Sequence, residues 1–186
     1  MRVPSSPSPV PEAVEIRRVF ATDGARVRAI RLEALSDPVA PIAFLGTFER
    51  AVRQPMSFWN DRATGAALGD TTAQFVAEAG RAWLGTVTVI LPEVGSVDDF
   101  GRVHPAGHSL LVAVYVAPVR RGTGLLADLV GAADEWARSR GRESMLLDVH
   151  EDNAPAQAAY RRLGFVETGG RWAGPNGTEL EMVRGR

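Results

Sequence analysis

The sequence predicts an α/β domain built on a mixed sheet. Runs rich in β-branched and aromatic residues alternate with helical patterns, in the order strand, two helices, two or three strands, helix, strand, helix, two strands. A chain of 186 residues has the size of one domain, and a hydrophobic share of 45% is enough for a substantial core. We see no internal repeat in the sequence.

The N-terminal segment stands apart from this pattern. Residues 1–12 are rich in proline and serine, which is typical of a disordered or polyproline-II tail. The segment has no apolar stretch of the secretory type. We therefore expect one folded domain over residues 13–186 and a cytoplasmic protein.

Each element of the domain follows from a local pattern. Strands are expected at residues 14–20, 72–78, 83–91, 109–116, 146–150, 165–168 and 178–183. Helices are expected at residues 24–35, in two pieces within 42–69, at 125–140 and around Tyr160. Thr22 or Asp23 would cap the first helix, and Pro55 would break the second. Residues 92–107 show no periodicity and are expected to form a loop.

The segment from Val114 to Val130 carries the clearest chemical signal. An apolar strand stops at Pro118, passes through Arg120, Arg121 and two glycines, and continues as an amphipathic helix. Free backbone N–H groups and the positive end of the helix dipole meet in such a loop, and glycine lets an anion come close. The unit therefore predicts a phosphate-binding loop, with backbone N–H groups from about Arg121 to Leu126 as the donors.

A second segment follows about thirty residues later. It is expected to form a buried strand, a helix that starts at Asn153 and carries Tyr160, and an exit at Gly164. Asn is a favoured N-cap residue. Tyr160 lies seven residues after Asn153, two helical turns along, so both side chains are expected on the same side of the helix.

Together the two segments resemble the GNAT N-acetyltransferases, which move an acetyl group from acetyl-CoA to an amine. The first segment matches that family's V-x-P-x-x-R-G-x-G-x-G/A loop at Val116, Pro118, Arg121, Gly122 and Gly124. The second matches the family's N-x-x-A-x-x-x-Y-x-x-x-G-F helix at Asn153, Ala156, Tyr160, Gly164 and Phe165. Leu126 departs from the loop pattern, because Gly or Ala is usual there. Its amide stays available to a phosphate if the side chain points away.

The resemblance covers about residues 108–166 and implies a fold. Members of this family have a mixed, mostly antiparallel central sheet flanked by helices on both faces. A V-shaped splay separates the two central parallel strands. We therefore expect a single GNAT-like domain over residues 13–186, in which the strand at 109–116 splays from the next strand.

The resemblance also implies an activity, the direct attack of a primary amine of a small molecule or protein on acetyl-CoA in a ternary complex. Donor contacts are implied for Val114, Tyr115, Val116, Arg121, Gly122, Thr123, Gly124, Leu125, Leu126, Asn153, Ala156 and Tyr160. A backbone N–H of the splayed strand would polarise the thioester carbonyl. Tyr160 would donate a proton to the leaving thiolate, because a phenol with a pKa of about 10 is protonated at neutral pH.

The sequence leaves the general base open. The strand at 109–116 has no carboxylate. Asp148 lies on the neighbouring strand, where some protein N-terminal acetyltransferases of the family have a catalytic Glu. Because side chains alternate along a strand, Leu147 and Val149 would pack on one face while Asp148 points to the other. Asp148 would then either take a proton from the amine or pin a neighbouring loop. A water chain acting on an already neutral amine would need no side chain as the base.

Two other functions fit parts of the pattern. The residues from Gly122 to Ala127 also read G-x-G-x-x-A, with Asp148 roughly 20–25 residues later, as in NAD-dependent oxidoreductases. That interpretation leaves the arginines before the glycines, Asn153 and Tyr160 unexplained. A non-catalytic acyl-CoA sensor would keep the loop and lose Tyr160, which is present.

Composition argues against several other classes. A net charge of −1 gives no electrostatic case for nucleic acid or an anionic membrane, and no apolar run approaches the ~20 residues of a membrane span. The chain has no cysteine, and its three histidines show no metal-ligand spacing, so we expect no metal. The expected partners are acetyl-CoA and an amine whose identity the sequence does not reveal. A homodimer is left open.

Overall fold

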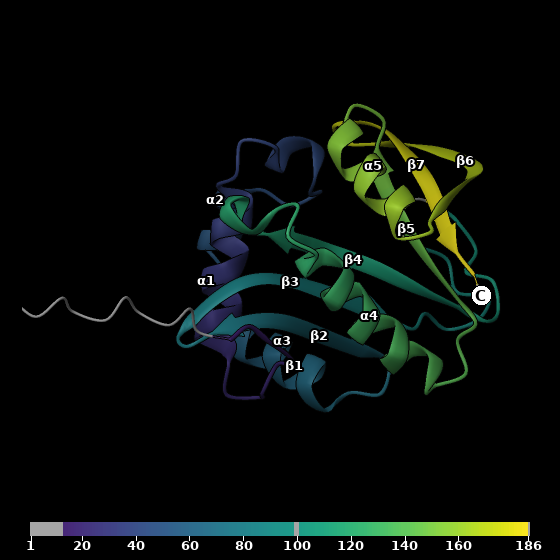
Figure 1. The fold of residues 1–186 in the computed structure, drawn as a ribbon. Helices are drawn as coiled ribbons and strands as arrows, with labels where there is room; N and C mark the ends of the chain where they lie inside the picture. Colours follow the sequence, from purple (N-terminus) through teal and green to yellow (C-terminus); the bar gives the residue numbers. More distant parts are fainter. Residues whose placement is uncertain (1–12, 99–100, 186) are drawn as a thin grey trace, which may run out of the picture.

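The computed structural model describes residues 13–98 and 101–185 of the chain. The strands are β1 (Glu15–Arg18), β2 (Thr72–Ala79), β3 (Ala82–Ile90), β4 (His108–Val116), β5 (Ser144–His150), β6 (Val166–Gly174) and β7 (Gly177–Arg184) (Figure 1). The α-helices are α1 (Gly24–Leu35), α2 (Phe48–Val52), α3 (Met56–Leu68), α4 (Leu125–Arg138) and α5 (Ala154–Arg162). Two short 3-10 helices are η1 (Ala40–Ile42) and η2 (Pro118–Arg120). The expected tail at residues 1–12 lies outside the described residues.

The strands form one sheet in the order β1-β2-β3-β4-β5-β7-β6. Neighbouring strands are antiparallel, except that β4 and β5 are parallel and are connected through α4. This confirms the predicted mixed, mostly antiparallel sheet. A Rossmann-type dinucleotide domain would instead need a mostly parallel sheet.

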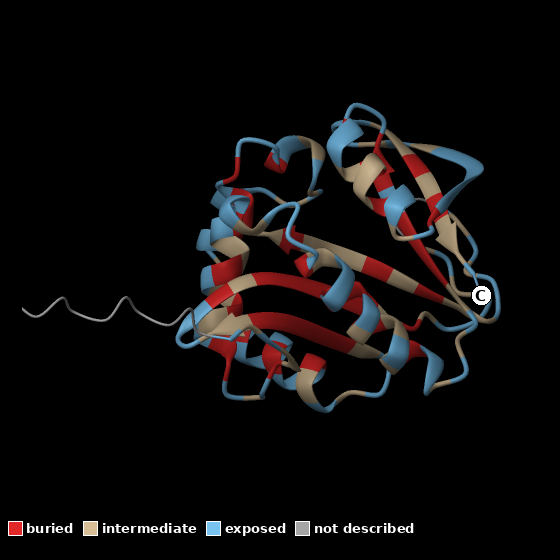
Figure 2. Ribbon diagram, viewed as in Figure 1, coloured by how far each residue is buried: buried red, intermediate tan, exposed pale blue. Residues whose placement is uncertain are grey.

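Two clusters of buried side chains lie on opposite faces of the sheet. One cluster, here the α4 cluster, joins side chains of α4 and α5 such as Leu129 and Tyr160 to the sheet. The other, the α1 cluster, joins side chains of α1 and α3 such as Trp59. Phe75 and Val76, adjacent on β2, belong to different clusters because side chains alternate faces. Helices therefore flank both faces as expected, and buried residues follow the central strands (Figure 2).

β4 and β5 pair only at their N-terminal ends. Their parallel register runs from His108 opposite Ser144 to Leu110 opposite Leu146. Beyond that point the two strands diverge, which is the predicted V-shaped splay (Figure 1). The glycine loop follows the diverging end of β4, and α5 follows the diverging end of β5. Both sequence motifs therefore lie at the opening of the splay.

A bulge interrupts β4 beyond the last residue paired with β5. The register with β3 shifts between Thr86 and Thr88 of that strand. Ala113, inside this shift, has a φ of 52°, in the left-handed region that a residue with a Cβ rarely adopts. The extra residue changes the face that later side chains occupy. Leu111 belongs to the α4 cluster before the bulge, and Tyr115 belongs to the α1 cluster after it.

The helices lie close to the expected ranges. α2 and α3 are separated at Pro55, as predicted, and α4 ends at Arg138 shortly before Gly141. η1 was not expected from the sequence. No helix in the described ranges is long and apolar enough to cross a membrane.

The closing hairpin is longer than predicted on its first side. β6 runs to Gly174, whereas the sequence suggested an end near residue 168. Its register with β7 shifts between Glu167 and Arg171, and Gly169 in this interval has a φ of 88°. The glycine accommodates an irregularity that lets pairing resume, so the Gly-rich stretch belongs to the strand.

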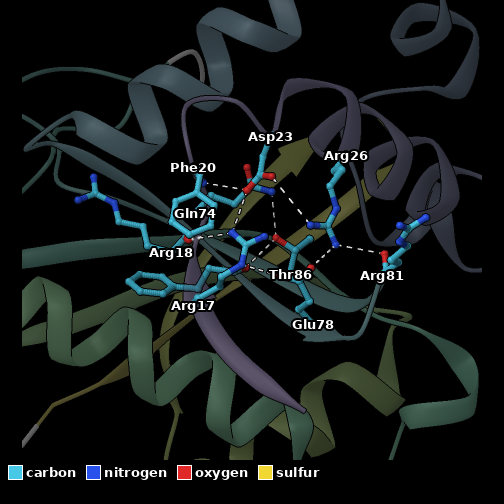
Figure 3. Close-up of polar contacts among 10 residues, drawn as sticks. Arg17, Arg18, Phe20, Asp23, Arg26, Gln74, Glu78, Arg81 and Thr86 are labelled. Carbon is cyan, nitrogen blue, oxygen red and sulfur yellow. Dashed lines mark hydrogen bonds and ion pairs between the residues drawn. The ribbon is translucent and has the colours of Figure 1, made fainter. Parts of the chain in front are cut away.

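A network of ion pairs joins α1 to β1 and β2 (Figure 3). Arg17 contacts Asp23 at 2.8 Å and Glu78 at 2.5 Å, and Arg26 reaches Glu78 at 2.5 Å. Asp23 was a candidate cap for α1, but its carboxylate accepts from Arg17 and from the N–H of Phe20 instead. Burial raises the pKa of Glu78, but hydrogen bonds from the two arginines outweigh it and hold that pKa below its usual value.

Candidate functional site

The glycine loop and the start of α4 form an open cradle of backbone amides. Gly122 and Gly124 have φ angles of 75° and 93°, and a Cβ at either position would meet no atom within 4 Å. The N–H groups from Gly122 to Leu126 donate to no acceptor among the described residues, whereas the next two donate to the Gly124 carbonyl. Unbonded amides at an exposed helix N-terminus are suited to bind an anion.

The other side chains of the loop leave this cradle open. Leu125 is buried in the α4 cluster, and Leu126 packs against the same cluster. The departure of Leu126 from the family pattern is therefore accommodated by the core. The hydroxyl of Thr123 donates to the Arg120 carbonyl at 2.7 Å, which stabilises the turn.

The diverging edge of β4 presents amides to the splay. The N–H of Ala117 donates to the Leu84 carbonyl of β3 at 2.9 Å. Because N–H directions alternate along a strand, the N–H groups of Val116 and Val114 point away from β3. β5 has no register with β4 at this level. These two amides therefore face the opening, while the side chains of both valines pack against the α4 cluster.

Tyr115 and Arg121 were expected at the donor site, and both make contacts toward α1. By the same alternation the Tyr115 amide faces β3, and its hydroxyl donates to Glu33 at 3.0 Å. Burial, with the nearby Glu33 carboxylate, raises the pKa of Tyr115. Arg121 pairs with buried Asp37 and donates from Nε to the Val116 carbonyl at 3.0 Å. These contacts hold the loop in place.

Asn153 and Ala156 form the first turn of α5. Asn153 is buried, and its Oδ1 accepts from the Ala156 N–H at 3.2 Å. Its Nδ2 donates to the Ile42 carbonyl at 3.3 Å. Asn153 therefore caps α5 and joins it to η1.

Tyr160 lies in the α4 cluster with 8% of its surface exposed. Its ring meets Phe165 edge-on, with 5.8 Å between ring centroids. The hydroxyl makes no hydrogen bond with any described residue. Burial raises the pKa of Tyr160 above its usual value of 10.0, so the phenol is protonated at neutral pH.

A cavity of about 650 Å³ is lined by residues of both strands of the splay, Leu110–Ala113 on β4 and Leu146–Asp148 on β5. Further walls come from α1, α3, residues 43–46, the loop around Arg102, and the β6–β7 hairpin. The charged lining of the cavity includes Arg31, Arg62, Arg102, Asp98, Asp148 and Glu179.

The family model described as the acetyltransferase (GNAT) family matches residues 41–165, which is more than half of the chain. The chain belongs to the GNAT acetyltransferase family. The matched range contains the cradle, the splayed edge of β4 and Tyr160.

Curated proteins resemble part of this chain in sequence, and solved proteins resemble it in fold. Streptothricin acetyltransferase of Streptomyces lavendulae is 45% identical to this chain over 56 residues, which cover 30% of each protein. The chain therefore matches under a third of that relative's length. A GNAT acetyltransferase of Streptococcus pneumoniae has a TM-score of 0.70 at 19% identity, covering 94% of this chain and 100% of that one. A PaiA N-acetyltransferase of Thermoplasma acidophilum, solved with coenzyme A, has a TM-score of 0.65 at 16% identity, with 94% and 99% covered.

Asp148 of this GNAT domain lies on the cavity side of β5. Leu147 and Val149 belong to the α4 cluster, as the predicted alternation requires. Arg102 donates to both carboxylate oxygens of Asp148 at 2.8 Å, and the Trp172 indole donates to one of them at 3.0 Å. Asp148 therefore joins the loop that carries Arg102 to β5, which is the pinning role. It can take a proton only by sharing or breaking that ion pair.

Glu179 of β7 is a second carboxylate in the cavity, and the motifs of the sequence do not point to it. Its carboxylate accepts no hydrogen bond from, and forms no ion pair with, a described residue. Burial raises the pKa of Glu179 above its usual value, and the charge of nearby Asp148 also raises it. The sequence signal was the alternation of Glu179 and Glu181 with buried Leu180 and Met182.

Proposed function

We propose that this GNAT protein is an acetyl-CoA-dependent N-acetyltransferase that acts on a primary amine by direct attack in a ternary complex. The observation that carries the proposal is the placement of three features at one splay. The cradle of unbonded amides follows β4, the free β4 edge borders the opening, and a cavity is lined by both strands. Two substrates could therefore meet at the opening.

The cradle suits the pyrophosphate of the donor, because an oxygen could approach the space that a Cβ at Gly122 or Gly124 would fill. Bound acetyl-CoA supplies the acetyl group as a thioester. The Val114 and Val116 amides would donate to its carbonyl oxygen, and one such preorganised donor typically contributes about 3 kcal/mol in acyl transfer. Asn153 would border the donor arm at the start of α5.

Tyr160 is assigned the role of general acid. The C–N bond forms as the C–S bond breaks, and the Tyr160 hydroxyl would give its proton to the thiolate sulfur. Burial raises the pKa of Tyr160, so the phenol carries the proton to be donated at every physiological pH.

Two carboxylates of the cavity are candidates for the general base, which takes the proton that the attacking ammonium loses. Asp148 lies on the splayed strand but is held by Arg102. Glu179 is not held by a described residue, and its raised pKa brings it closer to the value a base needs at neutral pH. We therefore assign the base role to Glu179 and keep Asp148 as the competing candidate.

The deciding experiment measures CoA release from acetyl-CoA with a panel of small primary amines and peptides, and identifies the acetylated product by mass. Stabilisation against heat by acetyl-CoA and by NAD is measured in parallel. We expect stabilisation by acetyl-CoA and turnover with at least one amine. Stabilisation by NAD alone would establish the oxidoreductase alternative, and donor binding without turnover on any amine would establish the sensor.

A further inference from the structure

Two arginines of the cavity have no anionic partner in the described part of the chain. Arg31 projects from α1 and Arg62 from α3, and both line the same space. Neither guanidinium group donates a hydrogen bond to, or forms an ion pair with, a described residue. The Arg31 guanidinium lies over the Phe44 ring, with 4.6 Å from its central carbon to the ring centroid. Two guanidinium groups thus share one recess.

Arg31 is half-buried and Arg62 is exposed, so the Arg31 guanidinium bears most of the cost of lacking an anion. Burial, together with the neighbouring Arg62 charge, lowers the pKa of Arg31 to about 10. The carboxylates of α1 and of the turn after it are used elsewhere, since Glu33 accepts from Tyr115 and Asp37 pairs with Arg121. Bidentate binding of a carboxylate by guanidinium would offset this cost.

The small recess beside the two arginines has one polar wall, formed by β2 and β3, while apolar side chains of α1 line its other wall. Gln74, Thr86 and Thr88 are buried side chains of β2 and β3 that line it together with Ala113. Gln74 donates to the Thr86 hydroxyl at 3.0 Å (Figure 3). A polar group bound here would therefore meet hydrogen-bonding partners in addition to the two charges.

The β5–β7 side of the cavity has the opposite charge. Asp98 and Asp148 share the guanidinium of Arg102, whereas Glu179 has no partner among the described residues. The cavity therefore holds unpaired cations beside β2–β4 and an unpaired carboxylate beside β5 and β7. The most complementary ligand carries an anion and a cation on one small molecule.

We propose that the acceptor of this enzyme is an amine that also carries a carboxylate, as in an amino acid. Arg31 and Arg62 would bind the carboxylate, and the ammonium group would lie toward Glu179. The inference rests on the proposed acetyl transfer and names its acceptor class. It also argues against polycationic acceptors, which would meet two arginines.

The test uses matched acceptors with the full-length native protein and acetyl-CoA. Amino acids with small, apolar, acidic, basic and aromatic side chains are each compared with their carboxamides and with the decarboxylated amines. Spermidine and O-phosphoethanolamine complete the panel. We expect the best amino acid to exceed its carboxamide about 10–100-fold in kcat/KM, because a charge-assisted hydrogen bond is lost in the neutral analogue.

Three variants show whether the two arginines cause that preference. Arg31→Gln and Arg62→Gln should each lower kcat/KM for the amino acid about 10-fold or more and leave the carboxamide within about 2-fold. Arg53→Gln changes an exposed arginine outside the cavity and should leave both values unchanged. A general packing defect would lower both acceptors together, so loss of the preference alone identifies carboxylate binding.

The outcomes separate the acceptor class from the acetyltransferase function. If amines are acetylated but no amino acid exceeds its carboxamide, the acceptor class is wrong and the acetyltransferase function stands. Preference for O-phosphoethanolamine or spermidine over every amino acid would also overturn the carboxylate assignment. If no acceptor in this panel or in the wider amine and peptide panel is acetylated while acetyl-CoA binds, both the function and the acceptor class fall. If the arginine variants do not fold, the comparison of acceptors with the native protein still shows whether the acceptor carries a carboxylate.

Discussion

The Tyr160 hydroxyl is a polar group within the core that binds no described residue, so its removal separates chemistry from packing. Tyr160→Phe keeps the edge-on contact with Phe165. We expect kcat to fall about 10²–10⁴-fold, because proton donation to the thiolate is lost. The affinity for acetyl-CoA, measured by calorimetry, should change little.

Tyr115→Phe is the matched control for that measurement. It removes the hydroxyl that donates to Glu33 and should cost about 1 kcal/mol of stability with little change in kcat. Native turnover in Tyr160→Phe would reduce Tyr160 to a packing residue.

The two cavity carboxylates differ in their expected pH dependence. Glu179→Gln should depress kcat/KM at neutral pH and recover partly at alkaline pH, where the amine loses its proton unaided. Asp148→Asn breaks the pair with Arg102, so it should lower stability and depress activity equally across the pH range. Full pH–rate profiles check this, and alkaline recovery in Asp148→Asn alone would return the base role to Asp148.

The proposed site for the donor's phosphates is the backbone of the loop before α4, so its test places a charge against that backbone. Acetyl-CoA at 100 times its dissociation constant should stabilise the native fold by about 2.7 kcal/mol. Gly124→Asp should abolish this stabilisation, because a carboxylate would repel the pyrophosphate. Thermal unfolding with and without acetyl-CoA measures the effect.

Gly95→Asp controls for the strain of that substitution. Gly95 has a φ of 79° and no atom within 4 Å of a Cβ, like Gly124, but it lies in the loop at residues 92–107. It should lose comparable stability and keep the full response to acetyl-CoA. An unchanged response in folded Gly124→Asp would exclude the loop as the phosphate site.

The stability of the whole molecule should depend on the network around Glu78. Because the folded-state pKa of Glu78 lies below its usual value of 4.5, its contribution is complete above pH 4.5 and is lost as the pH falls through the folded pKa. Glu78→Gln should therefore cost about 1.5–3 kcal/mol at pH 7, and the difference from native should shrink below pH 4.5.

Urea unfolding at pH 7 and at successively lower pH values measures that difference. Glu49→Gln, which changes an exposed glutamate of α2, should stay within about 0.5 kcal/mol of native at pH 7. A cost for Glu78→Gln that does not shrink in acid would show that shape, and not charge, is what Glu78 contributes.

Over the whole molecule, the sequence predicted those features that depend on a few neighbouring residues. The alternation around Asp148, the break at Pro55 and the glycine loop each depend on a few neighbouring residues, and each was predictable. The bulge at Gly169 was not, because a Gly-rich stretch fits a turn as well as an irregular strand.

The contacts of the candidate site were harder to predict because they join distant segments. Arg102 and Asp148 are 46 residues apart, and no spacing rule connects them. Arg31 and Arg62 resemble surface residues of amphipathic helices until α1 and α3 are placed beside the sheet. Glu179 comes to lie in the cavity only because β7 inserts between β5 and β6.

The single extra residue at Ala113 divides β4 into two parts with independent side-chain frames. Leu110 and Val112, before it, line the cavity, whereas Val114 and Val116, after it, form the proposed donor edge. Substitutions that adapt the residues before Ala113 to a new acceptor can therefore leave the residues after it unchanged. Deleting Ala113 would exchange inner and outer faces downstream, so the strand tolerates substitution far better than a change of length.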